Sequence, residues 1–317
     1  AASATMASTV IPELEKAGYD KGLAAGAIAA SGGLAAIIPP SVFLIIYAVL
    51  TDQSAGQMFI ATIGPGLLVT ALFSLYCIIR CYISPALGPT QPKSTWKERL
   101  ECLPSAIPVM VTFGIVIGGI YGGLATPTEA AALGVVGVII IAACMRRLNK
   151  KTLVSSFRDG ATMSAAIFFL FIGGWLMSRF LVTTGTTRHM VDVFVGMKMS
   201  YTMLLMMMFV LFLILGCILE STSILVLTMP FMFPITQQYG VDPIWFGVFV
   251  TMMMVLAGIS PPVGLNVFVV RGVCSHIPVM SIYRGAAPFI FIMCLSVLCI
   301  CIWPEMVLAP VRNMMGP

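Results

Sequence analysis

The stretch that decides the fold is GGLAAIIPPSVFLIIYAVL, residues 32 to 50, in which two consecutive prolines interrupt an apolar run. Proline lacks a backbone N–H and clashes with the preceding helical turn, so Pro39 and Pro40 break any helix formed here. Inside a bilayer, lipid cannot satisfy the polar backbone groups that such a break exposes. The sequence therefore predicts that the break is enclosed by protein or lines a polar site.

The composition indicates a polytopic membrane protein. Of the 317 residues 59% are hydrophobic and only 9% are charged, which is unlike a soluble domain. With about 20 residues expected per membrane span, hydropathy predicts an all-α fold with nine apolar segments. They run near 21–50, 58–83, 105–122, 129–145, 161–183, 201–219, 223–236, 243–273 and 283–309. The polar stretch 146–160 predicts a short interfacial amphipathic helix, with a solvated loop as the alternative.

An internal repeat relates the two ends of the chain. IPELEKAGYD (11–20) and FPITQQYGVD (233–242) share a proline, a glycine and an aspartate at an offset of 222 residues. The same offset carries the double proline to Pro261 and Pro262, in LAGISPPVGLNVFVV (256–270). We therefore expect two copies of one unit, each containing a broken helix.

The polar tip ESTS (220–223) between two apolar arms predicts a re-entrant hairpin over 201–240. Counting that hairpin as no net crossing makes the two broken helices run in opposite directions, an inverted repeat typical of secondary transporters. Thirteen of the 17 Lys and Arg residues, among them Lys21, Arg80 and Arg284, then fall on one side. Arg179 and Arg188 are among the four on the other side, a bias that supports this topology.

The offset also aligns Ala1 with Ser223, just beyond a hairpin tip. We therefore expect an N-terminally truncated fragment that lacks the first arm of its first hairpin. Cysteines lie at no metal-ligand spacing and are interpreted as small apolar residues.

Three motifs closely resemble one family. They are the first 68 residues, ending in IATIGPGLL, then GGIYGGLATPTEAAALGVVGV, and finally ILGCILESTSILVLTMPFMFPI with GVDPIWFGVFVTMMMVLAGISPPVGLNVFV. Over nearly the whole chain the sequence is similar to the large membrane subunit (DctM type) of tripartite ATP-independent periplasmic (TRAP) transporters.

The resemblance implies an elevator-type, sodium-coupled importer of organic acids such as C4-dicarboxylates or sialic acid in the bacterial inner membrane. It also implies a small four-helix membrane subunit and a periplasmic substrate-binding protein as partners, with no cofactor besides the coupling ion Na⁺. The hairpin opening is then periplasmic.

We expect six regions along the chain. The transport domain comprises 1–50, the second arm of hairpin 1 with its broken helix, and 201–273, hairpin 2 with the second broken helix. The remaining regions are the connecting helix and cytoplasmic loop (51–104), scaffold helices with the interfacial arm (105–160), a helix leading into the transport domain (161–200) and a C-terminal scaffold helix (274–317).

The breaks are the predicted sodium and substrate sites. Freed carbonyl oxygens bind hard cations, helix N-termini favour carboxylates, and small or hydroxyl-bearing residues let ligand and backbone approach closely. Half-site 2 comprises Glu220, Ser221, Thr222, Ser223, Gly258, Ile259, Ser260, Pro261, Pro262, Gly264 and Asn266. Half-site 1, which is partial, comprises Ser3, Thr5, Ser31, Gly32, Gly33, Pro39, Pro40 and Ser41.

Two acidic residues have structural interpretations as well. Glu220, at membrane depth, is either a sodium ligand or the N-cap of the second hairpin arm. In TPTEAA (126–131) we expect a helix with Thr128 as N-cap and Glu129 in its first turn.

Two other classes of function are open. A stand-alone elevator-type dicarboxylate or anion transporter would need no binding protein. An intramembrane enzyme is disfavoured, because the five aspartates fall in loops or at segment ends and His189 and His276 have no evident partner.

Overall fold

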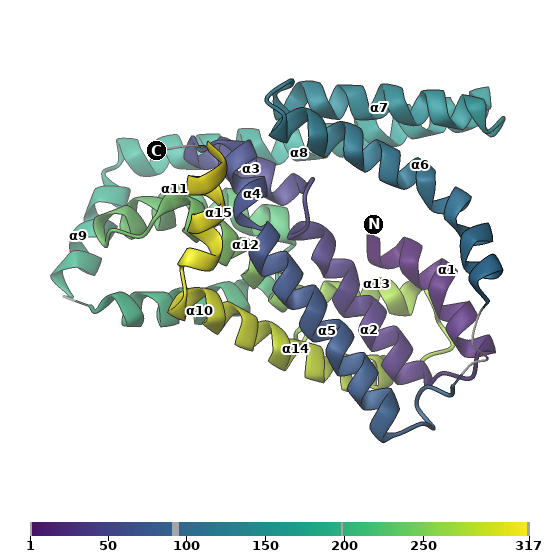
Figure 1. Cartoon of the computed structure of the whole chain (residues 1–317). Coiled ribbons are helices and arrows are strands. Elements are labelled where there is room, and N and C mark those ends of the chain that lie inside the picture. Colours follow the sequence, from purple (N-terminus) through teal and green to yellow (C-terminus); the bar gives the residue numbers. More distant parts are fainter. Residues whose placement is uncertain (1, 91–94, 198, 316–317) are drawn as a thin grey trace. The chain divides into compact units, whose positions relative to one another are not determined.

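The computed structural model describes residues 2–90, 95–197 and 199–315, and every regular element in that part of the chain is a helix (Figure 1). The elements are α1 (Ala2–Lys16), α2 (Lys21–Gly33), the 3-10 helix η1 (Leu34–Ala36), α3 (Val42–Thr51), α4 (Ala55–Ala61), α5 (Ile63–Ile83), α6 (Trp96–Tyr121), α7 (Pro127–Cys144), α8 (Lys150–Thr183), α9 (Thr186–Gly196), α10 (Tyr201–Gly216), α11 (Ser221–Gln238), α12 (Pro243–Ile259), α13 (Leu265–Val273), α14 (Val279–Ile302) and α15 (Glu305–Met315). The predicted all-α fold is confirmed. The helices form two compact units, Ala1–Thr90 with Gly174–Pro317, and Gln91–Gly173.

Both apolar runs with a double proline are broken helices. The first is α2, which tightens into η1 and stops, and α3 then begins after Ser41. The second is α12, which ends at Ile259, followed by α13 after Gly264. The break is therefore several residues long in each copy, and it begins before the prolines themselves.

The helix pattern repeats with the expected offset. The series α1, α2, α3 corresponds to α11, α12, α13, and a glycine with positive φ ends the first helix of each series, Gly18 at +82° and Gly240 at +68°. Asp20 and Asp242 then cap α2 and α12 by accepting hydrogen bonds from backbone N–H groups of the first turn. The short stretches that revealed the repeat thus encode the same turn and cap twice.

The two copies contact each other reciprocally. Helix α1 packs on α13, α11 packs on α3, and the two interrupted helices α2 and α12 touch each other. Each copy thus makes with the other the same contact that it receives, as expected for two units related by a two-fold axis. The second half of each broken helix is therefore held by the first helix of the other copy.

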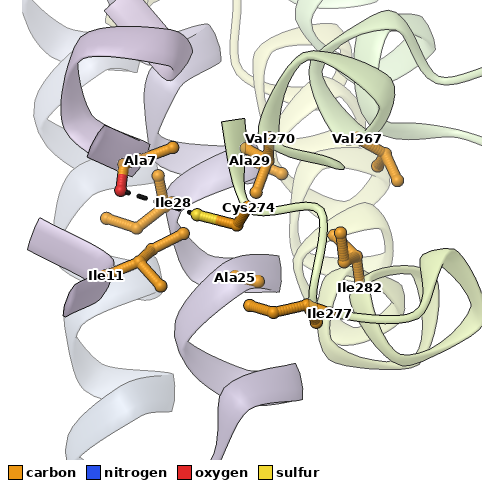
Figure 2. Close-up of a cluster of buried hydrophobic side chains, with 10 residues drawn as sticks. All are labelled: Ala7, Ile11, Ala25, Ile28, Ala29, Val267, Val270, Cys274, Ile277 and Ile282. Atoms are coloured by element: carbon orange, nitrogen blue, oxygen red, sulfur yellow. Dashed lines mark hydrogen bonds between the residues drawn. The ribbon is translucent and has the colours of Figure 1, made fainter. Parts of the chain in front are cut away.

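A buried apolar cluster joins α1, α2 and α13 with the start of α14 (Figure 2). Its members are Ala7, Ile11, Ala25, Ile28, Ala29, Val267, Val270, Cys274, Ile277 and Ile282. Helix α12 is buried along nearly its whole length, and its Trp245 indole donates to the carbonyl of Ile300 at 2.9 Å. Tyr47 on α3 donates to the carbonyl of Pro243 at 2.7 Å, so the polar ends of both rings have partners.

Helices α2 and α14 touch through glycines. An ideal Cβ at Gly285 would lie 1.9 Å from the Gly22 carbonyl oxygen, and one at Gly26 would lie 2.2 Å from the Gly285 carbonyl carbon. Glycines four residues apart on α2 thus create the close approach that small residues permit between membrane helices.

Much of the apolar surface remains exposed. Among the described residues four helices are long and apolar enough to cross a membrane: Ala55–Ile83, counting α4 and α5 together, then α7, α8 and α14. On α8 only 6% of the most apolar window is buried, and Phe168, Phe169 and Trp175 are exposed. An exposed apolar surface that runs along a whole helix is expected to be covered, and lipid would cover it.

Three local predictions are wrong. Residues 150–160 form no separate amphipathic helix, because α8 starts with Asn149 accepting from the Thr152 N–H at 2.7 Å and contains no proline to stop it. The apolar segment 283–309 is divided, since Pro304 follows the end of α14. The cap of α7 is Thr126, not Thr128, in a capping box with Glu129 that leaves Pro127 at the first helical position.

We expect Gly285→Ala to lower the melting midpoint in detergent, because the added methyl group meets the backbone of α2. The cost of such overpacking is roughly 1–3 kcal/mol. Gly272→Ala on α13 is the matched control, since its methyl group would have no neighbour within 4 Å. That control should be neutral or stabilising. Equal midpoints for the two variants would contradict the close α2–α14 contact.

Candidate functional site

Half-site 2 lies at the end of α12 and the start of α13. Gly258 and Ile259 form the last turn of α12, and Ser260 is its C-cap. Pro261 and Pro262 occupy the turn that follows, and Gly264, at φ +51°, starts α13 with Asn266 in its first turn. A left-handed backbone at position 264 suits glycine, because an ideal Cβ there would also lie 3.1 Å from the Ser260 carbonyl oxygen.

The carbonyls of this break divide into two groups. Cys217 donates to the Pro261 carbonyl at 3.3 Å, and the Tyr283 hydroxyl contacts the Pro262 and Val263 carbonyls at 3.0 and 2.6 Å. Among the described residues no donor reaches the carbonyls of Ile259 and Ser260, which are both buried residues. The carbonyls just before the prolines are therefore the ones in this break that remain available to a ligand, and the assignment of the site stays a prediction.

In half-site 1 two hydroxyl groups make short-range contacts to backbone carbonyls. Ser41 caps α3, and its hydroxyl also donates to the Ala36 carbonyl at 2.5 Å. The hydroxyl of Ser31 donates to the Ile28 carbonyl at 3.4 Å. Pro39 is buried and Pro40 is exposed.

Two further residues of half-site 1 lie on α1 and differ in placement. Ser3 is buried against Gly32, where an ideal Cβ would lie 2.1 Å from the Ser3 hydroxyl oxygen. Thr5 lies on the exposed side of the same helix, and its carbonyl accepts from Ser8 and Thr9. The structure therefore brings Ser3, but not Thr5, to the first break.

The two breaks meet at Asn266. An ideal Cβ on Gly33 would lie 3.3 Å from the Asn266 Nδ2 atom, and one on Gly258 would lie 3.4 Å from it. One amide side chain is thus flanked by the ends of α2 and α12, one from each copy. Because an amide offers both a donor and an acceptor, Asn266 can bridge the half-sites or coordinate a cation through its oxygen.

The hairpin tip reaches its own break. Gly216 at the end of α10 lies against Ala257, because an ideal Cβ at Gly216 would lie 2.1 Å from the Ala257 Cβ. The next residue, Cys217, donates the hydrogen bond to the Pro261 carbonyl described above. Glu220 caps α11, accepting from the N–H groups of Thr222 at 2.9 Å and Ser223 at 3.3 Å. Ser221, Thr222 and Ser223 form the first turn of α11. The capping interpretation of Glu220 is confirmed, and ion contact stays a prediction.

Comparison with known proteins identifies the family. The family model described as "Tripartite ATP-independent periplasmic transporter, DctM component" matches residues 1–306. The chain belongs to this family.

Several curated relatives are similar to the permease at 28–30% identity. One is the C4-dicarboxylate TRAP transporter large permease protein DctM of Vibrio cholerae, 30% identical, with 98% of this chain and 72% of that protein covered. The ectoine TRAP transporter large permease protein TeaC of Halomonas elongata is 28% identical, with 95% and 70% covered. The sialic acid TRAP transporter permease protein SiaT of Haemophilus influenzae is 29% identical, with 94% and 48% covered. The permease is thus a multi-pass membrane protein of a transporter family.

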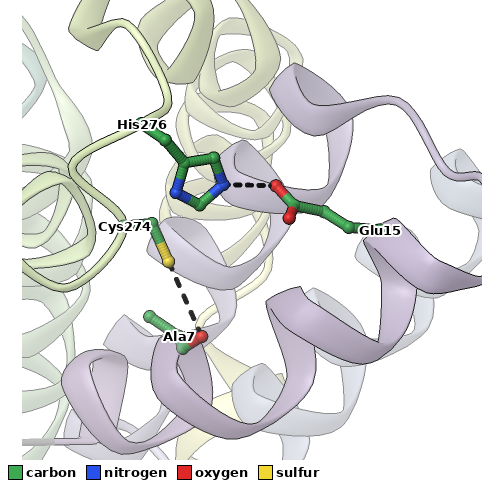
Figure 3. A network of polar contacts seen from close by, with 4 residues as sticks. All are labelled: Ala7, Glu15, Cys274 and His276. Carbon is green, nitrogen blue, oxygen red and sulfur yellow. Dashed lines mark hydrogen bonds and ion pairs between the residues drawn. The ribbon is translucent and has the colours of Figure 1, made fainter.

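His276 has a partner that the sequence did not reveal. Its Nε2 atom lies 2.6 Å from the Glu15 Oε1 atom, linking the α13–α14 loop to the end of α1 (Figure 3). Nearby, Cys274 donates to the Ala7 carbonyl at 3.8 Å. Burial, and secondarily the Glu15 carboxylate, raise the pKa of the Cys274 thiol, which keeps its proton for this bond. The expectation that His276 lacks a partner is wrong, because Glu15 is 261 residues away in sequence.

No group of three or more His, Cys, Asp or Glu side chains is placed to hold a metal ion within the described ranges. The donors that sequence reasoning missed are Cys217 and Tyr283. Both were interpreted only as parts of apolar segments. A periodic pattern shows which residues lie in such a segment, but it does not show which distant carbonyl a hydroxyl or thiol will reach.

We expect Glu220→Ala to destabilise the hairpin, since it leaves two first-turn N–H groups of α11 without their acceptor. Loss of an N-cap costs about 0.5–2 kcal/mol. Glu220→Ser retains a capping oxygen without the charge and should recover most of the lost melting midpoint. If serine were no better than alanine, capping would not be the role of this side chain.

Proposed function

We propose that the permease is the membrane subunit of a sodium-coupled secondary importer of organic acids. The observation that carries this proposal is the meeting of two broken helices at Asn266, in a chain whose family is a transporter permease family. Discontinuous helices near the membrane midplane are the usual places where secondary transporters bind ions and substrate.

The coupling ion is proposed to bind between the breaks. Sodium is a hard cation and takes oxygen ligands, and the Ile259 and Ser260 carbonyls are buried oxygens without a donor among the described residues. A buried carbonyl without a partner costs free energy that a bound cation recovers. The Asn266 amide oxygen supplies a third ligand from across the break. Gly33 and Gly258 leave room for this approach, because a methyl group at either position would touch the amide.

The substrate is proposed to be a carboxylate delivered by a periplasmic binding protein. Relatives of nearly equal similarity carry C4-dicarboxylate, sialic acid and ectoine in their names, so similarity alone does not identify the transported compound. A small four-helix membrane subunit and a binding protein are the proposed partners, consistent with a tripartite family. The bacterial sources of the relatives support a location in the inner membrane.

An elevator movement is proposed for the segments 1–50 and 201–273. Both segments belong to the same compact unit. Within it, α1 packs on α13 and α11 packs on α3, so each copy holds part of the other. Segments interlocked in this way are suited to move as one body and to carry both half-sites together. The re-entrant hairpin over 201–240 is proposed to open toward the periplasm.

Proteoliposome uptake tests this proposal. The permease complex is reconstituted with labelled C4-dicarboxylate or sialic acid, with and without its binding protein, in sodium or potassium medium. We expect uptake only with both sodium and the binding protein. Uptake that is unchanged in potassium would contradict sodium coupling, and uptake without the binding protein would favour a stand-alone transporter.

Asn266→Ala should raise the sodium concentration needed for half-maximal uptake by about tenfold, the effect of losing roughly 1.4 kcal/mol of ion binding. Asn313→Ala on α15 is the matched control, because that amide is exposed and lies on another helix. The same sodium dependence in both variants would exclude Asn266 from the ion site.

A further inference from the structure

A cavity of about 430 Å³ lies away from the two breaks, where α2 and α14 begin and α5 ends. Its polar and charged lining residues are Asp20, Lys21, Tyr76, Arg80, Ser281 and Arg284. All of them belong to the compact unit that includes Ala1–Thr90 and Gly174–Pro317. Three cations and one carboxylate therefore surround the cavity.

Close helix packing brings the cations together. Lys21 and Arg284 directly precede Gly22 and Gly285, the glycines at which the backbones of α2 and α14 touch. Arg80 follows Tyr76 by one helical turn, and the Tyr76 ring packs edge-on against Phe289 of α14 with centroids 5.1 Å apart. Helix α14 thus holds both α2 and α5, and the three basic side chains extend from adjoining helix ends.

The positive charge around the cavity is not neutralised within the described part of the chain. The Asp20 carboxylate caps α2 and accepts from the Leu23 N–H at 2.8 Å. No ion pair among the described residues involves Lys21, Arg80 or Arg284. Helix α14 begins after Pro278, which has no side-chain acceptor for the first-turn N–H groups, and Pro278 and Ser281 both line the cavity. Cations, a hydroxyl and a helix start converge on one space, an arrangement suited to a phosphate group.

We propose that this cavity binds the phosphate group of an anionic phospholipid from the membrane leaflet that it faces. Arg80 lies in the last turn of Ala55–Ile83, a helix long and apolar enough to span a membrane, which places the guanidinium at headgroup level. Beside it Ile79, Tyr82 and Ile83 are exposed and present an apolar surface to acyl chains. Basic pockets between membrane helices on the cytoplasmic side are known to take anionic headgroups. A free phosphate ion shares the chemistry and is separated from lipid by the test below.

The test uses the permease as isolated from its membrane and measures melting midpoints in detergent with added phosphatidylglycerol, cardiolipin, phosphatidylcholine or sodium phosphate. We expect the two anionic lipids to raise the midpoint by about 2–4 °C at about five times their dissociation constant. Phosphatidylcholine and sodium phosphate should not. The Arg80→Gln/Arg284→Gln variant should lose the shift, whereas Arg80→Lys/Arg284→Lys, which keeps both charges, should retain most of it.

Arg179→Gln/Arg188→Gln is the control, since it removes two charges predicted on the other side of the membrane, and it should keep the shift. An equal shift in the Arg80→Gln/Arg284→Gln variant would overturn the proposal. A shift with sodium phosphate alone would keep the anion site but overturn its assignment to lipid. If the glutamine variant does not fold, native mass spectrometry of the lysine variant decides: retained anionic lipid supports the site, and its loss overturns it. Because these readouts require no transport, they are independent of the proposed importer function.

Discussion

Backbone carbonyls and N–H groups that lose their helical partners inside a membrane have to find new ones within the protein, since lipid offers none. This constraint explains most of what surrounds the two double prolines. Cys217 and Tyr283 reach the carbonyls after the second break, and Ser41 reaches back across the first. At the second break the carbonyls of Ile259 and Ser260 remain without a donor among the described residues, and the other copy brings its own helix end close to this point.

The same constraint accounts for the small residues. A helix end can approach another only if no side chain stands between them, and Gly33 and Gly258 meet that condition on either side of Asn266. Gly22, Gly26 and Gly285 do the same for α2 and α14, which in turn places Lys21 and Arg284 beside each other. Close backbone contact therefore shapes both the proposed ion site and the proposed lipid site.

The sequence predicted the parts of this structure that depend on local chemistry. The double prolines break the helices where expected, and Gly18, Gly240, Asp20 and Asp242, which were identified only as repeat identities, prove to form the matching turns and caps. The offset of 222 residues could be read from the same positions. Contacts over long distances could not, because the pairs His276–Glu15 and Tyr283–Val263 depend on how helices pack rather than on spacing. The misplaced α7 cap has a simpler cause: two threonines precede Glu129, and only Thr126 leaves the proline at the first helical position.

The central claim is that the two breaks form one cation site around Asn266, and Gly258→Ala tests it most directly. The added methyl group would lie 3.4 Å from the Asn266 Nδ2 atom, an ordinary contact distance, so the variant should fold as well as the parent. The measurement is the rise in melting midpoint as sodium replaces potassium at constant ionic strength. We predict that the parent is stabilised by sodium and that Gly258→Ala needs severalfold more sodium for the same rise, with an unchanged midpoint in potassium. Identical sodium titrations for the two proteins, or no sodium effect on the parent, would contradict the account.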